Sequence, residues 1–174
     1  MYDHQTESLW LQVKREAVTG PLTGTRLKTL RSTITTWAKW KKRHPDTRVL
    51  TTDTGHRRNY NVDPYADYYK SRRGLFAGFF RGGPGEEAKA MVAGFELGAK
   101  HKAYPMSAIR EKGELRDLIG DREIIITLDR RTDTLSARTD DGTEVIPIVV
   151  YWFVWKGIHP ATERYGEEPK TSEH

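Results

Sequence analysis

The second half of the chain alternates apolar and polar residues in the manner of β-strands. Met91 to Leu97 and His101 to Tyr104 flank Gly98-Ala-Lys100, which is the spacing of a β-hairpin. Three further runs rich in β-branched residues also predict strands: Glu123 to Leu128, Thr134 to Thr139 and Val145 to Trp155. Within them, the triple Ile124–Ile126 and the pair Val149-Val150 are expected in central strands buried on both faces.

Helical periodicity is confined to short stretches. The clearest predicts a helix over Thr36–Arg43 that packs into the core through Trp37 and Trp40. Pro45 ends this helix, because the residue before a proline avoids the α region. A second helix of one or two turns is expected at Ser107 to Lys112. The helices are therefore a minor part of the predicted fold.

The middle of the chain has no regular period. A short strand is expected at Arg48–Thr52, and from His56 to Gly85 the sequence is rich in Arg, Asn, Gly and aromatic residues. We interpret this stretch as a long irregular loop that ends in the flexible segment Arg81–Gly85. Its aromatic side chains are expected to pin the loop: Tyr60, Tyr65, Tyr68, Tyr69, Phe76, Phe79 and Phe80. Loops of this length are uncommon unless they are functional or partly disordered.

These patterns predict a β-dominated α+β protein with a mixed sheet, a few short helices and a long irregular aromatic-rich loop. We expect one domain over residues 1–165 and a disordered polar tail over 166–174. A chain of 174 residues can bury a real core, and 36% hydrophobic with 30% charged residues indicates a modest one. The longest apolar run, Val145 to Trp155, is too short for a membrane helix, which needs about 20 residues.

Cysteine content and the first residues limit the classes of function. The chain has no cysteine, which excludes disulfides, thiolate zinc sites and cysteine nucleophiles. The first ten residues are polar and acidic where a secretory signal would be basic and then apolar, so the chain as written is expected in the cytoplasm.

The net charge of +5 is concentrated in one segment. Between Arg26 and Arg48 lie eight Lys or Arg residues and one acid, Asp46. Such a stripe can attract phosphates, and Trp37 and Trp40 could stack on bases, so nucleic-acid binding is one alternative function. A solvated helix face is the favoured interpretation. The residues that would contact nucleic acid are Lys39, Lys41, Lys42 and Arg43.

The best candidate binding site lies at the start of the irregular loop. It is a polar and aromatic cluster, in the kind of segment that often carries binding residues: Asp53, His56, Arg57, Arg58, Tyr60 and Tyr65. A loop held by Arg–Asp pairs and tyrosine hydroxyls is the favoured interpretation, and an enzyme or metal-dependent site at the His56 loop is an alternative. Asp53-Thr-Gly55 is formally an aspartic-protease triplet, but Thr52 and His56 beside it favour a polar turn.

The six histidines do not predict a metal site. No two of them have the i,i+2 or i,i+4 spacing of metal ligands, and no cofactor motif is present. His159 before Pro160 is expected to orient a turn, whereas convergence of His56 with His101 in space stays open. Serine-hydrolase and phosphate-loop motifs are also missing from the sequence.

Several segments, in order, resemble one family. They are Met1 to Trp10, Lys102-Ala-Tyr-Pro-Met106, the stretch from Leu115 to Ile126, and Tyr151–Trp155 followed by Ile158-His-Pro160. Together they are similar, over most of residues 1–165, to the carboxyl half of the domain-of-unknown-function family numbered 3179. The resemblance implies longer relatives with a second Lys-Ala-Tyr-Pro unit and a cysteine motif, which often look exported or lipid-anchored. It implies no established activity.

Two expectations follow from this resemblance. Because Met1 resembles an internal residue of longer relatives, we expect a truncated chain, and the exposed sheet edge would favour a homodimer. The leading functional hypothesis is a non-catalytic binding or structural module with an unknown ligand or protein partner. Whether the protein is an enzyme stays open.

Overall fold

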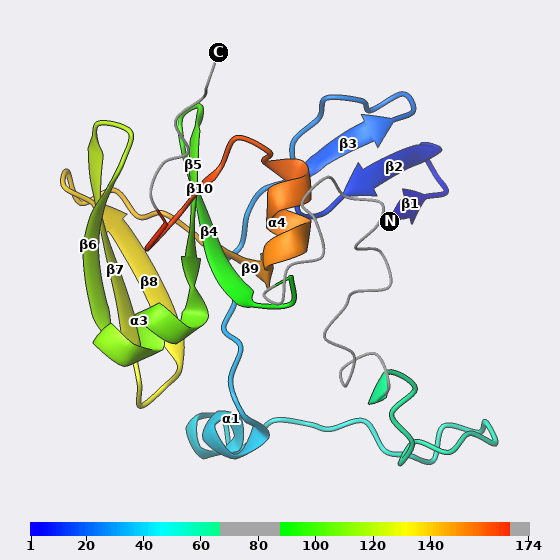
Figure 1. Ribbon diagram of the computed structural model, residues 1–174. Coiled ribbons are helices and arrows are strands. Elements are labelled where there is room, and N and C mark those ends of the chain that lie inside the picture. Colours follow the sequence, from blue (N-terminus) through cyan, green and yellow to red (C-terminus); the bar gives the residue numbers. More distant parts are fainter. Residues whose placement is uncertain (67–87, 168–174) are drawn as a thin grey trace.

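The computed structural model describes residues 1–66 and 88–167, and within them the protein is β-dominated (Figure 1). The described part contains three sheets and three short helices, which is the composition of a β-dominated α+β protein. The sheet orders are β1-β2-β3, β10-β5-β4-β9 and β6-β7-β8. The α+β prediction is therefore confirmed.

The four-stranded sheet is mixed and holds the centre of the molecule. β4 (Met91–Leu97) pairs antiparallel with β5 (Lys100–Pro105) and with β9 (Ile148–Tyr151). β10 (Glu163–Arg164) adds to the other edge of β5 in parallel. Helix α4 (Trp152–Ile158) connects β9 to β10 and lies over the sheet. Its Trp155 ring lies so close to Gly94 that a Cβ there would be 2.4 Å from ring atoms.

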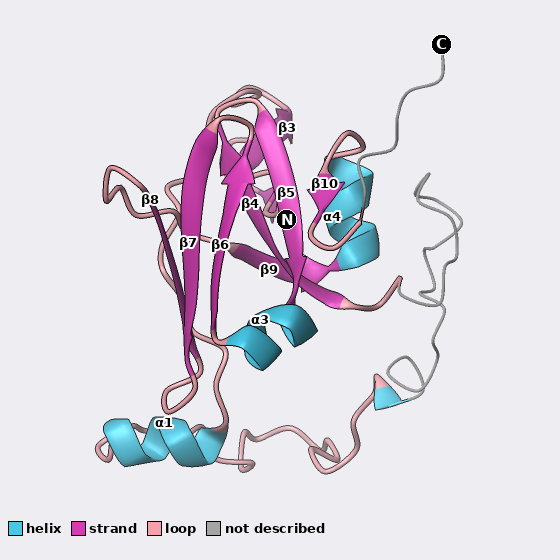
Figure 2. Ribbon diagram, turned by 60° about the vertical axis from the view of Figure 1, so that its left-hand side comes forward, coloured by secondary structure: helices cyan, strands magenta, loops and turns pink. Residues whose placement is uncertain are grey.

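The second sheet is antiparallel and stands beside the first (Figure 2). It consists of β6 (Glu114–Ile119), β7 (Arg122–Asp129) and β8 (Thr134–Thr139), and α3 (Met106–Lys112) joins it to β5. The side chains that fill the main core come from both sheets and from α3: Phe95, Tyr104, Ile109, Ile119, Ile124 and Ile126. All six are almost fully buried, because each side chain points into the core between the two sheets and α3.

The amino-terminal region forms a separate small sheet followed by an extended segment. The sheet contains β1 (Tyr2–Asp3), β2 (Ser8–Leu11) and β3 (Glu16–Thr19). Helix α1 (Trp37–Arg43) lies outside the sheets, and residues 44–66 run away from them in both views (Figures 1 and 2).

Most predicted elements are confirmed. The hairpin of β4 and β5, the strands β7 and β8, and the helices α1 and α3 lie within one or two residues of their expected bounds. Thr36 caps α1 by accepting a hydrogen bond from the Lys39 amide at 3.3 Å. Gly113 ends α3 with φ of 76°, a conformation that glycine adopts without strain.

Some expectations for the strands were wrong. The run Val145–Trp155 is not one strand: it forms β9 and then turns into α4, because a continuous apolar run has no period that separates strand from helix. β9 is an edge strand, against the expectation for Val149-Val150. β7 is the central strand of its sheet as expected, but Ile125 is only half-buried, so only one face of β7 is fully covered. Arg48–Thr52 forms no strand, since no neighbouring strand pairs with it.

The packing of α1 also differs from the expectation. Trp37 is 52% exposed and Trp40 37% exposed, and the helix buries no residue. The sequence pattern identified a helix correctly, but among the described residues neither tryptophan is buried in the core.

Part of the predicted loop lies outside the described residues. This applies to Tyr68, Tyr69, Phe76, Phe79, Phe80 and the segment Arg81–Gly85, and to residues 168–174 of the predicted tail. Among the residues that the structure describes, no helix combines the length and the apolar character needed to cross a membrane.

Candidate metal centre

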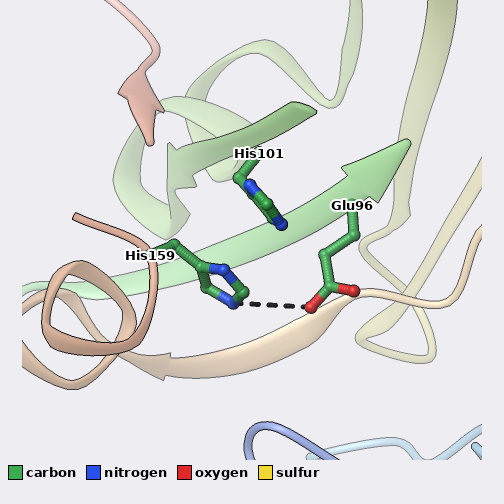
Figure 3. Close-up of side chains that lie close together, drawn as sticks. All are labelled: Glu96, His101 and His159. Carbon is green, nitrogen blue, oxygen red and sulfur yellow. Dashed lines mark ion pairs between the residues drawn. The ribbon is translucent and has the colours of Figure 1, made fainter. Parts of the chain in front are cut away.

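Two strands and one helix end bring Glu96, His101 and His159 together (Figure 3). Glu96 on β4 lies directly opposite His101 on β5, because the tight turn of this hairpin sets their register. His159 is the residue that ends α4, and its backbone N–H donates to the Trp155 carbonyl at 2.9 Å. The cluster therefore depends on how α4 lies across the β4–β5 hairpin.

His159 is held tightly in this cluster. Its ring stacks on His101 with centroids 4.2 Å apart and packs against Trp155 at the same distance. The His159 side chain is only 10% exposed. Its Nε2 is buried and has no hydrogen-bond partner, although Glu96 Oε1 is 3.4 Å away. A buried polar atom without a partner is costly, so this nitrogen is free for a ligand.

A cation from the amino-terminal sheet neutralises Glu96 from its other side. Arg15, in the turn between β2 and β3, forms an ion pair with Glu96 Oε2, while Oε1 faces His159. This contact ties the small sheet to the four-stranded sheet. It also fixes which carboxylate oxygen is directed into the cluster.

The electrostatics of the cluster favour a neutral imidazole. Burial is the main cause that lowers the pKa of His159, and His101 and Arg15 act in the same direction while Glu96 opposes them. A histidine with a lowered pKa is neutral at neutral pH, so a ring lone pair is available for a metal ion.

Two imidazoles and one carboxylate form a ligand set that zinc and related ions accept. The three ligand atoms all lie within 4.8 Å of one another. Around a tetrahedral ion with bonds of about 2.0–2.1 Å, ligand atoms are about 3.3 Å apart. The Glu96–His159 separation of 3.4 Å is close to this value, and a ring nitrogen of His101 lies within 4.8 Å of both ligand atoms.

A second polar cluster has a structural role. Lys102 Nζ lies 2.8 Å from Asp117 Oδ2 and 3.5 Å from Glu163, and the Tyr104 hydroxyl donates to Asp117 at 3.0 Å. Burial followed by the nearby Asp117 charge raises the pKa of Tyr104, so its hydroxyl stays protonated. Burial opposes ionisation of Asp117, but the hydrogen bonds from Lys102, the Leu118 amide and Tyr104 lower its pKa overall. The cluster ties β5 to β6 and β10.

One cavity of about 300 Å³ lies among α3, β8, β9 and the extended segment before α1. Its walls include Met91, Met106 and Leu135, and Arg31 and Arg110 also line it. Arg31 is paired with Glu144 there. The cavity shares no residue with the cluster of Glu96, His101 and His159.

The structure places the six residues of the sequence-predicted site on the exposed segment that follows α1. Asp53, His56, Arg57, Arg58, Tyr60 and Tyr65 are all solvent-exposed. Within the described range 1–66 and 88–167, no ion pair joins Asp53 to either arginine, whereas Tyr60 Oη lies 2.6 Å from Thr54 Oγ1. The histidine that meets His101 is His159 rather than His56.

The residues predicted to bind nucleic acid lie on α1. Lys41, Lys42 and Arg43 are exposed, but Lys39 Nζ contacts Asp133 Oδ2 at 2.5 Å and the Arg130 carbonyl at 3.3 Å. Lys39 is therefore already occupied by an acid of the turn between β7 and β8. The free positive charge on α1 is smaller than the sequence indicates.

Sequence reasoning did not identify Glu96 or His159 as site residues. Strand alternation and the hairpin turn do place Glu96 opposite His101, and that signal is present in the sequence. His159 lies far along the chain, and only the docking of α4 on the sheet brings it to the pair.

The fold and the cluster define a β-rich α+β protein with a half-buried cluster of two histidines and one glutamate. The chain belongs to the family described as "Protein of unknown function (DUF3179)", whose model matches residues 1–146. This range contains Glu96 and His101 and ends before His159. No curated protein and no solved structure matches the chain.

Proposed function

We propose that this protein is a binding module for a divalent transition-metal ion of the zinc type. The observation that supports the proposal best is the buried, unpartnered Nε2 of His159, which faces a carboxylate oxygen beside a second imidazole. The ligands would be Glu96 Oε1 and one ring nitrogen each from His101 and His159.

A simple His–Glu ion pair accounts less well for this arrangement. Its formation would require a protonated His159, but burial lowers the pKa of this residue. The Glu96 charge is moreover already compensated by Arg15. A metal ion instead uses the neutral imidazole, and Arg15 then acts as an outer partner that orients the ligand carboxylate.

Packing prepares the site before the ion arrives. The Trp155 ring and the helix-end hydrogen bond hold His159, and strand pairing holds Glu96 and His101. Binding therefore costs little conformational entropy, which raises affinity. The position of the site on paired strands and a helix end is consistent with a binding module, in which these three residues would hold the ion.

Metal binding can be measured on the purified full chain. We expect about one Zn²⁺ per chain by calorimetry, and a tetrahedral d–d spectrum when Co²⁺ is used. The variants Glu96→Gln, His101→Gln and His159→Gln should each weaken binding by more than the about 10–100-fold typical of an outer partner.

The matched control is His44→Gln, because His44 also ends a short helix and contacts a Trp ring, but among the described residues it belongs to no group of possible metal ligands. It should leave the affinity unchanged. The proposal is wrong if the wild-type chain binds no Zn²⁺ at micromolar concentrations, or if His44→Gln weakens binding as much as His159→Gln does.

The alternative of nucleic-acid binding by α1 has weaker support. Its favourable feature is the exposed Trp37 beside Lys41 and Lys42. The pairing of Lys39 with Asp133 reduces the charge that phosphates would meet. The alternative of a site at the His56 loop rests on exposed residues that are spread along one segment, so the metal proposal is preferred.

A further inference from the structure

Two segments of the chain carry the same motif and the same local structure. The motif Trp-x-x-Trp-Lys-x-x-His-Pro-x-Thr occurs at residues 37–47 and again at 152–162. In each case the first seven residues form a helix, α1 or α4, and the histidine ends it. The corresponding pairs are Trp37 and Trp152, Trp40 and Trp155, His44 and His159, and Thr47 and Thr162.

The hydrogen bonds and ring contacts of the two copies agree closely. The Nε1 of Trp40 donates to Thr47 Oγ1 at 3.0 Å, and that of Trp155 donates to Thr162 Oγ1 at 2.9 Å. The histidine ring lies 4.1 Å from the tryptophan ring in the first copy and 4.2 Å in the second. Both histidines have similar backbone angles, with ψ of 71° and 74°. The match extends beyond sequence to geometry.

A second pair of segments repeats in the same order. The pattern Asp-x-x-Thr-Glu/Asp-Ser/Thr-Leu occurs at residues 3–9 and at 129–135. Both form the turn of a hairpin in which the fifth residue has positive φ, 52° at Glu7 and 55° at Asp133. The strand register is also the same, since Asp3 pairs with Ser8 as Asp129 pairs with Thr134. A side-chain hydrogen bond from the threonine is the main cause that lowers the pKa of each aspartate.

The copies differ in what surrounds them. In the second copy Trp155 is fully buried on Gly94, and β10 pairs in parallel with the outer edge of β5. In the first copy Trp40 is 37% exposed, and the residues equivalent to β10, Arg48 and Val49, form no strand. The second copy thus shows which surface this motif covers when it is packed: an antiparallel hairpin with a glycine under the tryptophan.

From this comparison we propose that residues 37–50, called here the α1 unit, are a docking element for a β-hairpin built like β4–β5. Trp40 would lie on a residue without a side chain, as Trp155 lies on Gly94. Arg48 and Val49 would add in parallel to the outer strand, as β10 adds to β5. The exposed apolar side chains Val49 and Leu50 would then be covered.

The β4–β5 hairpin of the same chain cannot be the acceptor, because α4 and β10 already occupy it. The occupant is therefore a second hairpin of this build, with a glycine under the tryptophan and an open outer strand.

The test supplies such a segment in the correct register. A second copy of residues 88–126, which contains β4, β5, α3, β6 and most of β7, is joined directly to Met1 of the full chain. Hydrogen exchange with mass spectrometry then follows peptides that cover residues 36–50. We expect their protection to rise at least about tenfold and to approach that of residues 151–165.

The matched control carries Gly94→Val in the added copy only, because a side chain there would collide with the docked tryptophan. Protection of residues 36–50 should then be lost while that of 151–165 is kept. The proposal is overturned if residues 36–50 exchange as fast in the extended chain as in the original, or if the valine has no effect. The proposal is also overturned if the added segment itself shows no protection from hydrogen exchange, since the α1 unit is proposed to cover it.

A separate sample of the original chain tests the competing partner. Protection of residues 36–50 by a single-stranded oligonucleotide of about 20 thymidines, without protection by the added hairpin, would overturn the docking proposal in favour of nucleic acid.

Discussion

The α1 unit and its counterpart, α4 with β10, have the same internal structure and very different surroundings. Each has a seven-residue helix, a histidine at its end, and a Trp–Thr hydrogen bond across the following turn. One is exposed beside the body of the protein and the other is buried against the central sheet. The comparison shows that the motif specifies a local shape and that a neighbouring hairpin decides whether this shape is buried.

The same comparison explains why only one of the two histidines belongs to the candidate metal centre. His159 is placed beside Glu96 and His101 by the docking of α4, whereas His44 contacts the Trp40 ring at the end of α1, a helix that lies outside the sheets. An identical local position therefore acquires metal-binding potential only where the tertiary structure adds the other ligands. Paired substitutions at equivalent positions can test this difference.

The largest difference is expected for the second tryptophan of each motif. Trp155→Ala removes a fully buried ring over Gly94 and should lower the free energy of unfolding by about 3–5 kcal/mol. Trp40→Ala removes a ring that is 37% exposed and should cost about 1 kcal/mol or less. Urea unfolding followed by far-ultraviolet circular dichroism measures both. Equal losses would show that α1 is packed in solution and would contradict the comparison.

A smaller difference is expected for the threonines that accept the tryptophan hydrogen bonds. Thr162→Val leaves the buried Trp155 Nε1 without an acceptor and should cost about 1–3 kcal/mol. Thr47→Val should be nearly neutral, because water can replace the acceptor at the exposed Trp40. The urea midpoints of the two variants measure this difference in stability. Thr162→Ser keeps the hydroxyl and should therefore retain most of the wild-type stability. A neutral Thr162→Val would mean that the indole finds another partner.

The smallest effect concerns pH and the two histidines. The pKa of His159 is lowered in the folded state, so below about pH 6.5 the unfolded chain binds a proton that the folded chain does not. Stability should therefore fall as pH decreases from this value towards the folded-state pKa. Glu96, His101 and Arg15 also act on the His159 ring. The contribution of His159 is therefore obtained by comparing the pH dependence of stability in the wild-type chain and in variants.

We expect His159→Gln to flatten the dependence of the urea midpoint on pH between about 6.5 and 5, and His44→Gln to leave it unchanged. The measurement is made in metal-free buffer, because a bound ion would also be released by acid. An identical slope in the wild-type and His159→Gln chains would show that His159 titrates normally.

Local signals in the sequence predicted much of the fold. Alternation and a tight turn identified the β4–β5 hairpin, and β-branched runs identified β7 and β8. The same signals failed at Val145–Trp155, where every residue type fits a buried strand or a buried helix. They failed again at Arg48–Thr52, where β-propensity exists but no partner strand is described. A strand requires a neighbour, and propensity does not reveal one.

Only part of the candidate site could be predicted from the sequence. Hairpin register places Glu96 opposite His101, but sequence spacing gave His159 no role beyond a turn. The repeated Trp–Trp–His–Pro–Thr spacing is a further sequence signal, which analysis of apolar periodicity does not detect because it compares identities rather than hydrophobicity.

What the sequence by itself determined is therefore the set of local shapes: the hairpins, the short helices, and the two copies of a helix that ends in a histidine packed against a tryptophan ring. Each of these depends on residues close together in the chain. Only the tertiary structure decided that one copy covers Gly94 while the other stays exposed, and that His159 meets Glu96 and His101. Burial and ligand convergence depend on contacts between distant segments, which local propensities do not encode.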